Sequence, residues 1–308
     1  MDKRKIILDC DPGHDDAIAI LLAGKSNKIE LLGITVSSGN QTIEKTSRNA
    51  YNLVKYLDIN VPVAVGCTHP IIKDVEVCAK IHGESGLDGF TFPNYEYNFD
   101  SRHAVNFIID TILENKDTTM VVTGPLTNFA LALRLNPSIK NNIKEVILMG
   151  GSIMNGNVSP AAEFNILCDP EAADIVFKSG IKIKMVGLDV TRKVLLLPEI
   201  LESYKNIETK SAKLFYALMK VFNENQADTF GFKGAPLHDP ATILSIIDDS
   251  LITYKKMNVE IDLSHGCSYG RTNCDYFNYL NKEPNAYVAI DINVDRYWEL
   301  IKEHLIIK

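Results

Sequence analysis

The sequence has no hydrophobic run that approaches the ~18 consecutive apolar residues of a membrane-spanning helix. The apolar stretch at 6–8 is also too short for the core of a secretory signal peptide. Six cysteines are present, and none belongs to a C-x-x-C pair, so the spacing of a zinc site is absent and reduced thiols are expected. We therefore expect a cytoplasmic protein that neither spans a membrane nor is secreted through such a signal.

Basic residues are too few and too scattered for a nucleic-acid surface. Lys and Arg total 32 against 39 Asp and Glu, which gives a net charge of -7, and the longest basic run is the one at 3–5. Because binding to phosphates needs a basic stripe, nucleic acid is excluded as a partner. The 46% of hydrophobic residues is typical of a globular chain and excludes disordered and collagen-like proteins.

Apolar runs alternate with segments of helical period through the first two thirds of the chain. The predicted strands are at 6–9, 31–37, 61–66, 119–123, 145–149 and 181–188, and the predicted helices include 42–57, 102–114, 126–135 and 170–179. Continuous Ile, Val and Leu runs indicate strands that are buried on both faces. We therefore predict an α/β protein with an open, mostly parallel, Rossmann-like doubly wound sheet and a site at the carboxyl ends of its strands.

Two stretches, 67–100 and 223–237, interrupt this alternation and are rich in turn residues. Long connections in a compact domain usually serve as lids or binding loops, which is the prediction for both. The tail predicts strands at 259–262 and 286–293 and a closing helix at 294–307. No internal repeat or linker is present, so residues 1–308 are predicted to form a single domain.

Polar residues gather where the predicted strands end. They are Asp9, Asp11, Asp15 and Asp16 after the first strand, Asn40 after the second, Thr123 after the fourth, Asn157, Glu163 and Asn165 after the fifth, and His238 with Asp239 before a later helix. Four carboxylates within eight residues would repel one another strongly unless a cation lay between them. Oxygen donors favour Ca²⁺ or Mg²⁺ over zinc, and a roomy site shared with ligand oxygens favours Ca²⁺.

Two roles besides metal binding remain open for the acidic cluster. Asp15 or Asp16 could cap the following helix, although one acid would suffice for that. A D-x-D pattern also occurs in phosphoryl-transfer enzymes with an aspartyl nucleophile, but Pro12-Gly13 replaces the small loop of that chemistry and no lysine-containing phosphate motif follows. An EF-hand is excluded, because its sixth position would be His14 instead of Gly.

Seven segments, in order along the whole chain, resemble the nucleoside hydrolase family. They are D-x-D-P-G-x-D-D at 9–16, S-G-N-Q-T at 38–42, I-H-G-E-S-G-L-D-G at 81–89, T-G-P-L-T-N at 123–128, L-M-G-G at 148–151, A-E-F-N at 162–165 and H-D-P at 238–240. The later Y-G-R-T-x-C-D at 269–275 is most similar to bacterial pyrimidine-preferring members.

This resemblance implies hydrolysis of the N-glycosidic bond of a ribonucleoside around a bound Ca²⁺. Asp11, Asp16 and Asp239 would bind the metal through their side chains, and Thr123 would bind it through its main-chain carbonyl. Asp15 would act as the general base for a water whose pKa the metal lowers. The attack on the anomeric carbon would pass through an oxocarbenium-like transition state, as in glycoside hydrolysis generally.

The resemblance also implies the contacts to ribose. Asn40, Asn157, Glu163 and Asn165 supply amide and carboxylate partners for the three hydroxyls. On an extended stretch, Glu163 and Asn165 would point to the same side because they are two residues apart. A site built around these hydroxyls would reject deoxy analogues, since its own polar groups would be left unpaired.

Two histidines match the family's active-site histidines and would stabilise the leaving base. His238 is the better candidate acid because it precedes the metal ligand, and His82 lies in a Gly-rich segment. The pyrimidine-preferring members have a Gln and a Tyr four apart that contact the base, and this chain has Gln226 and Phe230 there. Phe230 keeps the aromatic ring but lacks the hydroxyl of the Tyr, so it cannot relay a proton or donate a hydrogen bond through that group. The remaining histidines, His14 among them, are interpreted as structural or exposed.

Three functions stay open on the sequence. The first choice is a pyrimidine ribonucleoside hydrolase, the second is a purine or broad-specificity hydrolase, and the third is a non-catalytic protein that binds nucleosides with the help of a metal. The family resemblance also implies a homo-oligomer, commonly a tetramer.

Overall fold

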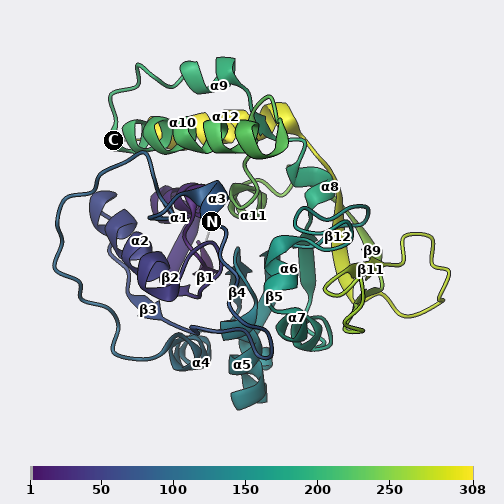
Figure 1. Ribbon diagram of the computed structural model, residues 1–308. Helices are drawn as coiled ribbons and strands as arrows, with labels where there is room; N and C mark the ends of the chain where they lie inside the picture. The colour runs from purple at the N-terminus through teal and green to yellow at the C-terminus, as the bar shows by residue number, and fades with distance from the viewer. Residues whose placement is uncertain (1–2, 308) are drawn as a thin grey trace.

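The computed structural model describes residues 3–307. Within that range, eight strands form one sheet in the order β3-β2-β1-β4-β5-β6-β12-β9 (Figure 1). The strands are β1 (Arg4–Cys10), β2 (Ile29–Val36), β3 (Val63–Val65), β4 (Thr118–Val122), β5 (Ile143–Met149), β6 (Ile183–Val186), β9 (Ile252–Met257) and β12 (Ala286–Ile292). Neighbours are parallel except β12 and β9. The predicted α/β class and doubly wound sheet are confirmed.

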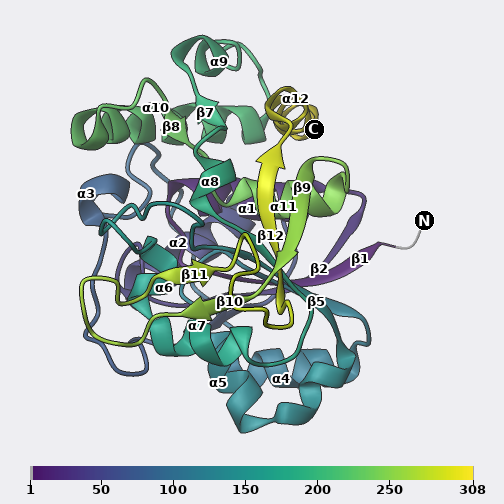
Figure 2. The same ribbon diagram turned by 90° about the vertical axis from the view of Figure 1, so that its right-hand side faces the viewer.

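Helices cover both faces of the sheet (Figures 1 and 2). One face packs against α1 (His14–Lys25), α2 (Ile43–Tyr56), α10 (Lys210–Phe230), α11 (Pro240–Ile247) and α12 (Val294–Leu305), and the other against α4 (Ala104–Glu114), α5 (Thr127–Leu135) and α7 (Pro170–Phe177). Ile6 and Leu8 of β1 contribute to the first core and Ile7 to the second, because successive strand side chains point to opposite faces. None of the helices within 3–307 is both long and apolar enough to cross a membrane.

Short elements connect the strands and helices of these layers. They are α3 (Ala79–His82), the 3₁₀ helix η1 (Pro137–Asn142), α6 (Phe164–Cys168), α8 (Leu188–Thr191), α9 (Pro198–Glu202), and two small antiparallel pairs, β7 (Leu195–Leu196) with β8 (Ala235–Pro236) and β10 (Val259–Ile261) with β11 (Thr272–Cys274).

One prediction about the second half of the chain was wrong in detail. The stretch 223–237 is not one long loop, because α10 continues to Phe230 and ends at Gly231, whose φ of 68° is left-handed. Apolar positions at helical spacing continue through Phe222 and hold this part against the core. The predicted strand at 259–262 is confirmed as β10, which pairs with β11 outside the large sheet.

A buried carboxylate lies among cations in the sheet. The carboxylate of Glu145 in β5 forms ion pairs with Arg4 at 2.6 Å, with Lys182 at 2.9 Å and with Lys184 at 3.5 Å. Burial raises the pKa of Glu145, but the hydrogen bonds from Lys182 and Arg4 and the charge of Lys184 outweigh it, so the pKa lies below its ordinary value.

We expect Glu145→Gln to lower the free energy of unfolding by about 2 kcal/mol at pH 7, because three cations lose their buried partner. Since the folded pKa of Glu145 is depressed, its contribution is present above the unfolded pKa of ~4.3 and is lost as the pH falls through the folded pKa. Urea unfolding of both proteins at pH 7 and near pH 3 measures this difference. Glu260→Gln removes a half-exposed pair with Lys282 and should cost under ~1 kcal/mol; equal losses in both variants would contradict the account.

Candidate active site

Of the four acids that the sequence singles out, Asp11 lies in the turn between β1 and α1, and Asp15 and Asp16 follow at the start of α1. Gly13 is the N-cap of α1, and its N–H donates to Oδ2 of Asp16 at 3.0 Å. A Cβ at Gly13 would collide with the ring of His82 and the amide of Asn40, so this turn requires glycine. Asp15 and Asp16 occupy the first helical turn, where the helix dipole favours negative charge.

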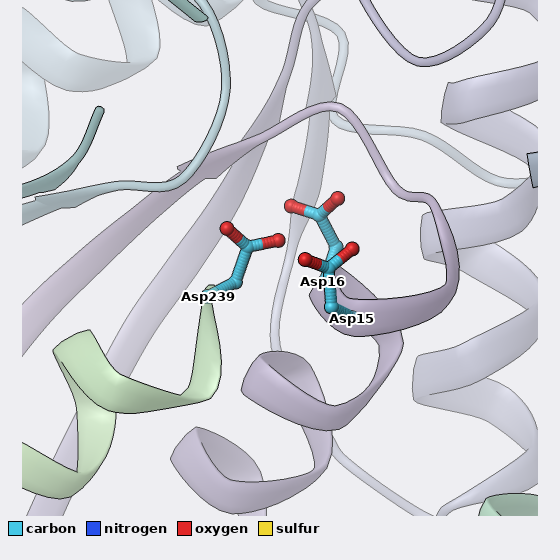
Figure 3. A group of neighbouring side chains, drawn as sticks. All are labelled: Asp15, Asp16 and Asp239. Atoms are coloured by element: carbon cyan, nitrogen blue, oxygen red, sulfur yellow. The ribbon is translucent and has the colours of Figure 1, made fainter. Parts of the chain in front are cut away.

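Three carboxylates converge at one point. Asp15 and Asp16 come from the start of α1 and Asp239 comes from the start of α11, and Figure 3 shows their carboxylates facing one another. One oxygen from each lies within 4.8 Å of the others, and all three side chains are buried. The chain thus brings residues from opposite ends of its sequence into an all-oxygen cluster that could hold a hard cation.

Asp11 lies beside this cluster and outside it. Its Oδ2 accepts the main-chain N–H of Asn40 at 2.6 Å, while its buried Oδ1 has no hydrogen-bond partner within residues 3–307. Gly39 and Gly124 enclose the carboxylate so closely that a Cβ at either position would collide with it. A buried oxygen held in place without a donor is available to a cation.

Burial and mutual repulsion disfavour the charged forms of these acids. Burial first, and then the charge of Asp16, raise the pKa of Asp15 to about 7. Burial raises the pKa of Asp16 to about 6, against hydrogen bonds from Gly13 and Thr123. The pKa values of Asp11 and Asp239 are raised well above the ordinary range by burial and neighbouring carboxylates. A divalent cation between the carboxylates would favour their charged forms and so lower these pKa values. The residues therefore suit a divalent metal ion.

Thr123 and Asn165 complete the floor of the cluster. The hydroxyl of Thr123 donates to Oδ1 of Asp16 at 2.8 Å, and its main-chain carbonyl accepts from Nδ2 of Asn165 at 2.9 Å. That carbonyl oxygen retains a second lone pair for a metal.

Asp9 does not belong to the cluster, which corrects the expectation of four acids around one cation. It lies within β1, and its Oδ1 accepts from Thr35 at 2.7 Å and from Asn128 at 2.9 Å. Burial raises its pKa to about 7, partly offset by these two bonds. Strand alternation directs it away from the turn that carries the other acids.

A pocket with about 550 Å³ of space, part of it open to solvent, lies over the cluster. The predicted residues that line it are Asp15, Asn40, His82, Thr123, Asn157, Glu163, Asn165, Gln226, Phe230, His238 and Asp239. Asp11 and Asp16 are fully buried and lie outside this lining. The residues predicted from segments far apart in the sequence therefore meet in one cavity.

The polar wall of the pocket differs in conformation from the prediction. Glu163 is the N-cap of α6, and its carboxylate accepts the main-chain N–H groups of Gly151, Asn165 and Ile166. Asn165 lies within α6, so the pair is not on an extended stretch. The side chain of Asn157 accepts the N–H of Phe164 at 2.9 Å. Capping thus holds this wall in place.

Gln226 and Phe230 lie one turn apart at the end of α10. Gln226 is 5% exposed, and its buried Oε1 has no hydrogen-bond partner within the described chain. Phe230 is 48% exposed at the mouth of the pocket. A buried amide without a partner, next to an aromatic ring, suits a flat polar ligand.

Both predicted histidines face the pocket as neutral rings. Burial lowers the pKa of His82 well below its usual value, with smaller contributions from His14 and His238. Burial, together with the charge of Arg192, lowers the pKa of His238 to about 3. Nδ1 of His238 lies 2.7 Å from the hydroxyl of Thr191, and Nδ1 of His82 accepts the main-chain N–H of His14 at 3.1 Å.

Sequence reasoning missed several lining residues, namely Cys78, Ile81, Met149, Val158, Phe164 and Phe222. Phe222 stacks on His82 and on His14, with ring centroids at 5.5 and 5.2 Å. Phe222 lies one helical turn before Gln226. A prediction that extended this helix to Phe230 would therefore have placed Phe222 on the same face as Gln226. His14 is fully buried and contacts the main-chain oxygen of Asp88 at 2.8 Å, so it anchors the segment that follows His82.

Comparisons with known proteins agree with this site. A model of the family described as inosine-uridine preferring nucleoside hydrolase matches residues 6–299. The pyrimidine-specific ribonucleoside hydrolase RihB of Escherichia coli strain K12 is 45% identical over 304 residues, 98% of this chain and 97% of that protein. The solved structure of a plant nucleoside hydrolase, PpNRh1, has a TM-score of 0.94 at 31% identity and full coverage of both chains.

A second solved structure is the purine-preferring ribonucleoside hydrolase from Gardnerella vaginalis. It has a TM-score of 0.92 at 35% identity, over 98% of each chain. Each of these matches covers most of the chain. The chain belongs to the inosine-uridine preferring nucleoside hydrolase family, enzymes that hydrolyse the N-glycosidic bond of ribonucleosides.

Proposed function

We propose that residues 1–308 form one catalytic unit that hydrolyses pyrimidine ribonucleosides, uridine and cytidine, to ribose and free base with a bound Ca²⁺. The observation that carries this proposal is the single pocket in which the carboxylate cluster, the amide wall and Gln226 meet. The pyrimidine preference rests on the similarity to RihB and on the unpartnered amide oxygen of Gln226.

In this proposal Asp11, Asp16, Asp239 and the main-chain carbonyl of Thr123 hold the metal. Bound there, Ca²⁺ would lower the pKa of a coordinated water and orient the substrate. Asp15 accepts the proton of the attacking water, because its carboxylate lines the pocket beside Asp16 and Asp239.

The remaining pocket residues bind and orient the nucleoside. Asn40, Asn157, Glu163 and Asn165 hydrogen-bond the ribose hydroxyls at the buried end of the pocket. His82 and His238 stabilise the leaving base. Gln226 and Phe230 contact that base at the mouth, the Gln through its amide and the Phe through its ring.

Purine or broad specificity is the second candidate. It is favoured by the absence of a hydroxyl on Phe230 and by the similarity to the purine-preferring ribonucleoside hydrolase from Gardnerella vaginalis. We also propose a homo-oligomer, a tetramer by family resemblance, in the cytoplasm; light scattering of the purified protein tests the assembly.

We expect rapid release of reducing sugar from uridine or cytidine, slower release from inosine and adenosine, and loss of all release after Ca²⁺ is removed by a chelator. Parallel assays of the four nucleosides, with Ca²⁺ or Mg²⁺ added back, measure this. A preference above about tenfold for inosine would assign the purine class. Binding of uridine without turnover would support a non-catalytic binding protein.

A further inference from the structure

The ring of His238 has one fixed neighbour on the side away from the pocket. Its Nδ1 lies 2.7 Å from Oγ1 of Thr191, at the end of α8. Thr191 is fully buried, whereas His238 lines the pocket. The hydrogen bond between them therefore joins the pocket to a residue outside its lining.

The direction of this hydrogen bond follows from what surrounds the hydroxyl. A threonine hydroxyl carries one proton. In Thr46 the hydroxyl proton has main-chain carbonyls to bind, the nearest being that of Ser37 at 2.9 Å. Within residues 3–307, the hydroxyl of Thr191 has no acceptor besides Nδ1 of His238. The hydroxyl therefore donates to Nδ1, which cannot then carry a proton itself.

We infer that Thr191 is a positioning residue, which holds His238 as the neutral tautomer that presents Nε2–H to the pocket. This inference rests on the proposed hydrolase function. In residues 3–307, Nε2 of His238 has no hydrogen-bond partner, so its proton is available to the leaving base. His82 adopts the same tautomer, because its Nδ1 accepts the main-chain N–H of His14.

Helix α8 is held firmly enough to set the position of the hydroxyl. The carboxylate of Asp189 accepts the N–H groups of Ile153 and Met154 at 2.6 and 3.1 Å. Arg192 donates to the carbonyls of Asn155 and Gly156 at 3.2 and 2.6 Å. The same short helix thus holds the loop that leads to Asn157 and the ring of His238.

A neutral imidazole N–H stabilises the leaving base without giving up its proton. When the C1′–N bond breaks, its electron pair moves to the base nitrogen and negative charge develops on the base. Water forms the new bond to C1′, and its proton passes to Asp15 and from there to the base. His238 lowers the barrier through a hydrogen bond to the developing charge.

The test uses Thr191→Val and the conservative variant Thr191→Ser in the full chain. We expect Thr191→Val to lower kcat on uridine roughly 10- to 100-fold with KM changed less than about threefold, and Thr191→Ser to stay near wild type. p-Nitrophenyl riboside should lose less than about threefold, since its leaving group needs no hydrogen bond. Equal losses on both substrates would overturn the inference, because they would indicate a general structural defect.

A second measurement does not depend on turnover. Nitrogen NMR of ¹⁵N-histidine protein, with His238 assigned from the signal lost in His238→Gln, should show protonated Nε2 and bare Nδ1 in wild type and in Thr191→Ser. Thr191→Val should shift that signal toward the other tautomer. Protonated Nδ1 in the wild type would overturn the inference even in an active enzyme. Conversely, the expected tautomer in a protein inactive on every nucleoside would support it while the proposed function fails.

Discussion

Asp15→Asn should lower kcat on uridine by about 10³-fold and leave the affinity for Ca²⁺ within about tenfold of wild type. The amide has the shape of the carboxylate but cannot take a proton from water. In the structure, Asp15 lines the pocket next to Asp239, and its raised pKa comes chiefly from burial. Steady-state kinetics together with calorimetric titration of Ca²⁺ measure the two quantities separately.

A matched control is Asp9→Asn, which makes the same substitution at a buried acid of the same segment. Its bonds from Thr35 and Asn128 can be kept by the amide oxygen, so kcat should fall by less than about tenfold. Full activity of Asp15→Asn would remove Asp15 from the mechanism. Loss of Ca²⁺ binding in that variant would instead make it a metal ligand, as its place in the carboxylate cluster would allow.

Asp11→Asn should weaken Ca²⁺ binding by at least about 100-fold, since even residues that only support metal ligands commonly contribute 10- to 100-fold. Oδ2 of Asp11 accepts the N–H of Asn40, so the amide oxygen of the variant would keep that bond. The amide NH₂ would then stand in place of the unpartnered Oδ1 and could not bind a cation. Gly39 and Gly124 enclose the group closely, so the neutral amide would occupy the same place as the carboxylate.

The readouts for Asp11→Asn are the Ca²⁺ affinity and the Ca²⁺ concentration that gives half-maximal activity. At saturating Ca²⁺ most of the activity should return, which separates a lost ligand from a lost base. The Asp9→Asn protein again serves as the control, with unchanged affinity. Unchanged affinity in Asp11→Asn would leave Asp15, Asp16 and Asp239 as the carboxylates that hold the metal.

The sequence predicts the sheet well, because buried parallel strands leave a local signal of continuous apolar runs. The predicted runs at 6–9 and 145–149 coincide with the centres of β1 and β5. The positions of Asp15 and Asp239 follow from the same logic, since strand ends and helix starts meet at one edge of the sheet. The order of the strands and the pairing of β10 with β11 depend on contacts between distant segments and leave no comparable local signal.

Side-chain direction is the part that local patterns do not determine. Asp9 is an acid in the same motif as the site residues, but its place inside β1 directs its side chain to Thr35 and Asn128. Glu163 caps a five-residue helix that no periodicity could reveal. Thr191 has no distinctive neighbours in the sequence, and only the approach of α8 to His238 gives it a role.

The convergence of Asp15 and Asp16 with Asp239 also links the metal to folding. These residues come from the first and last thirds of the chain, so the cluster exists only after α11 has packed against α1. Until a cation arrives, the native state carries their unrelieved repulsion, which the unfolded chain does not have. A cation that binds only the native state therefore shifts the folding equilibrium by mass action, by about 2.7 kcal/mol at 100 times its dissociation constant. During synthesis, the chain cannot gain this stabilisation before Asp239 and α11 have left the ribosome.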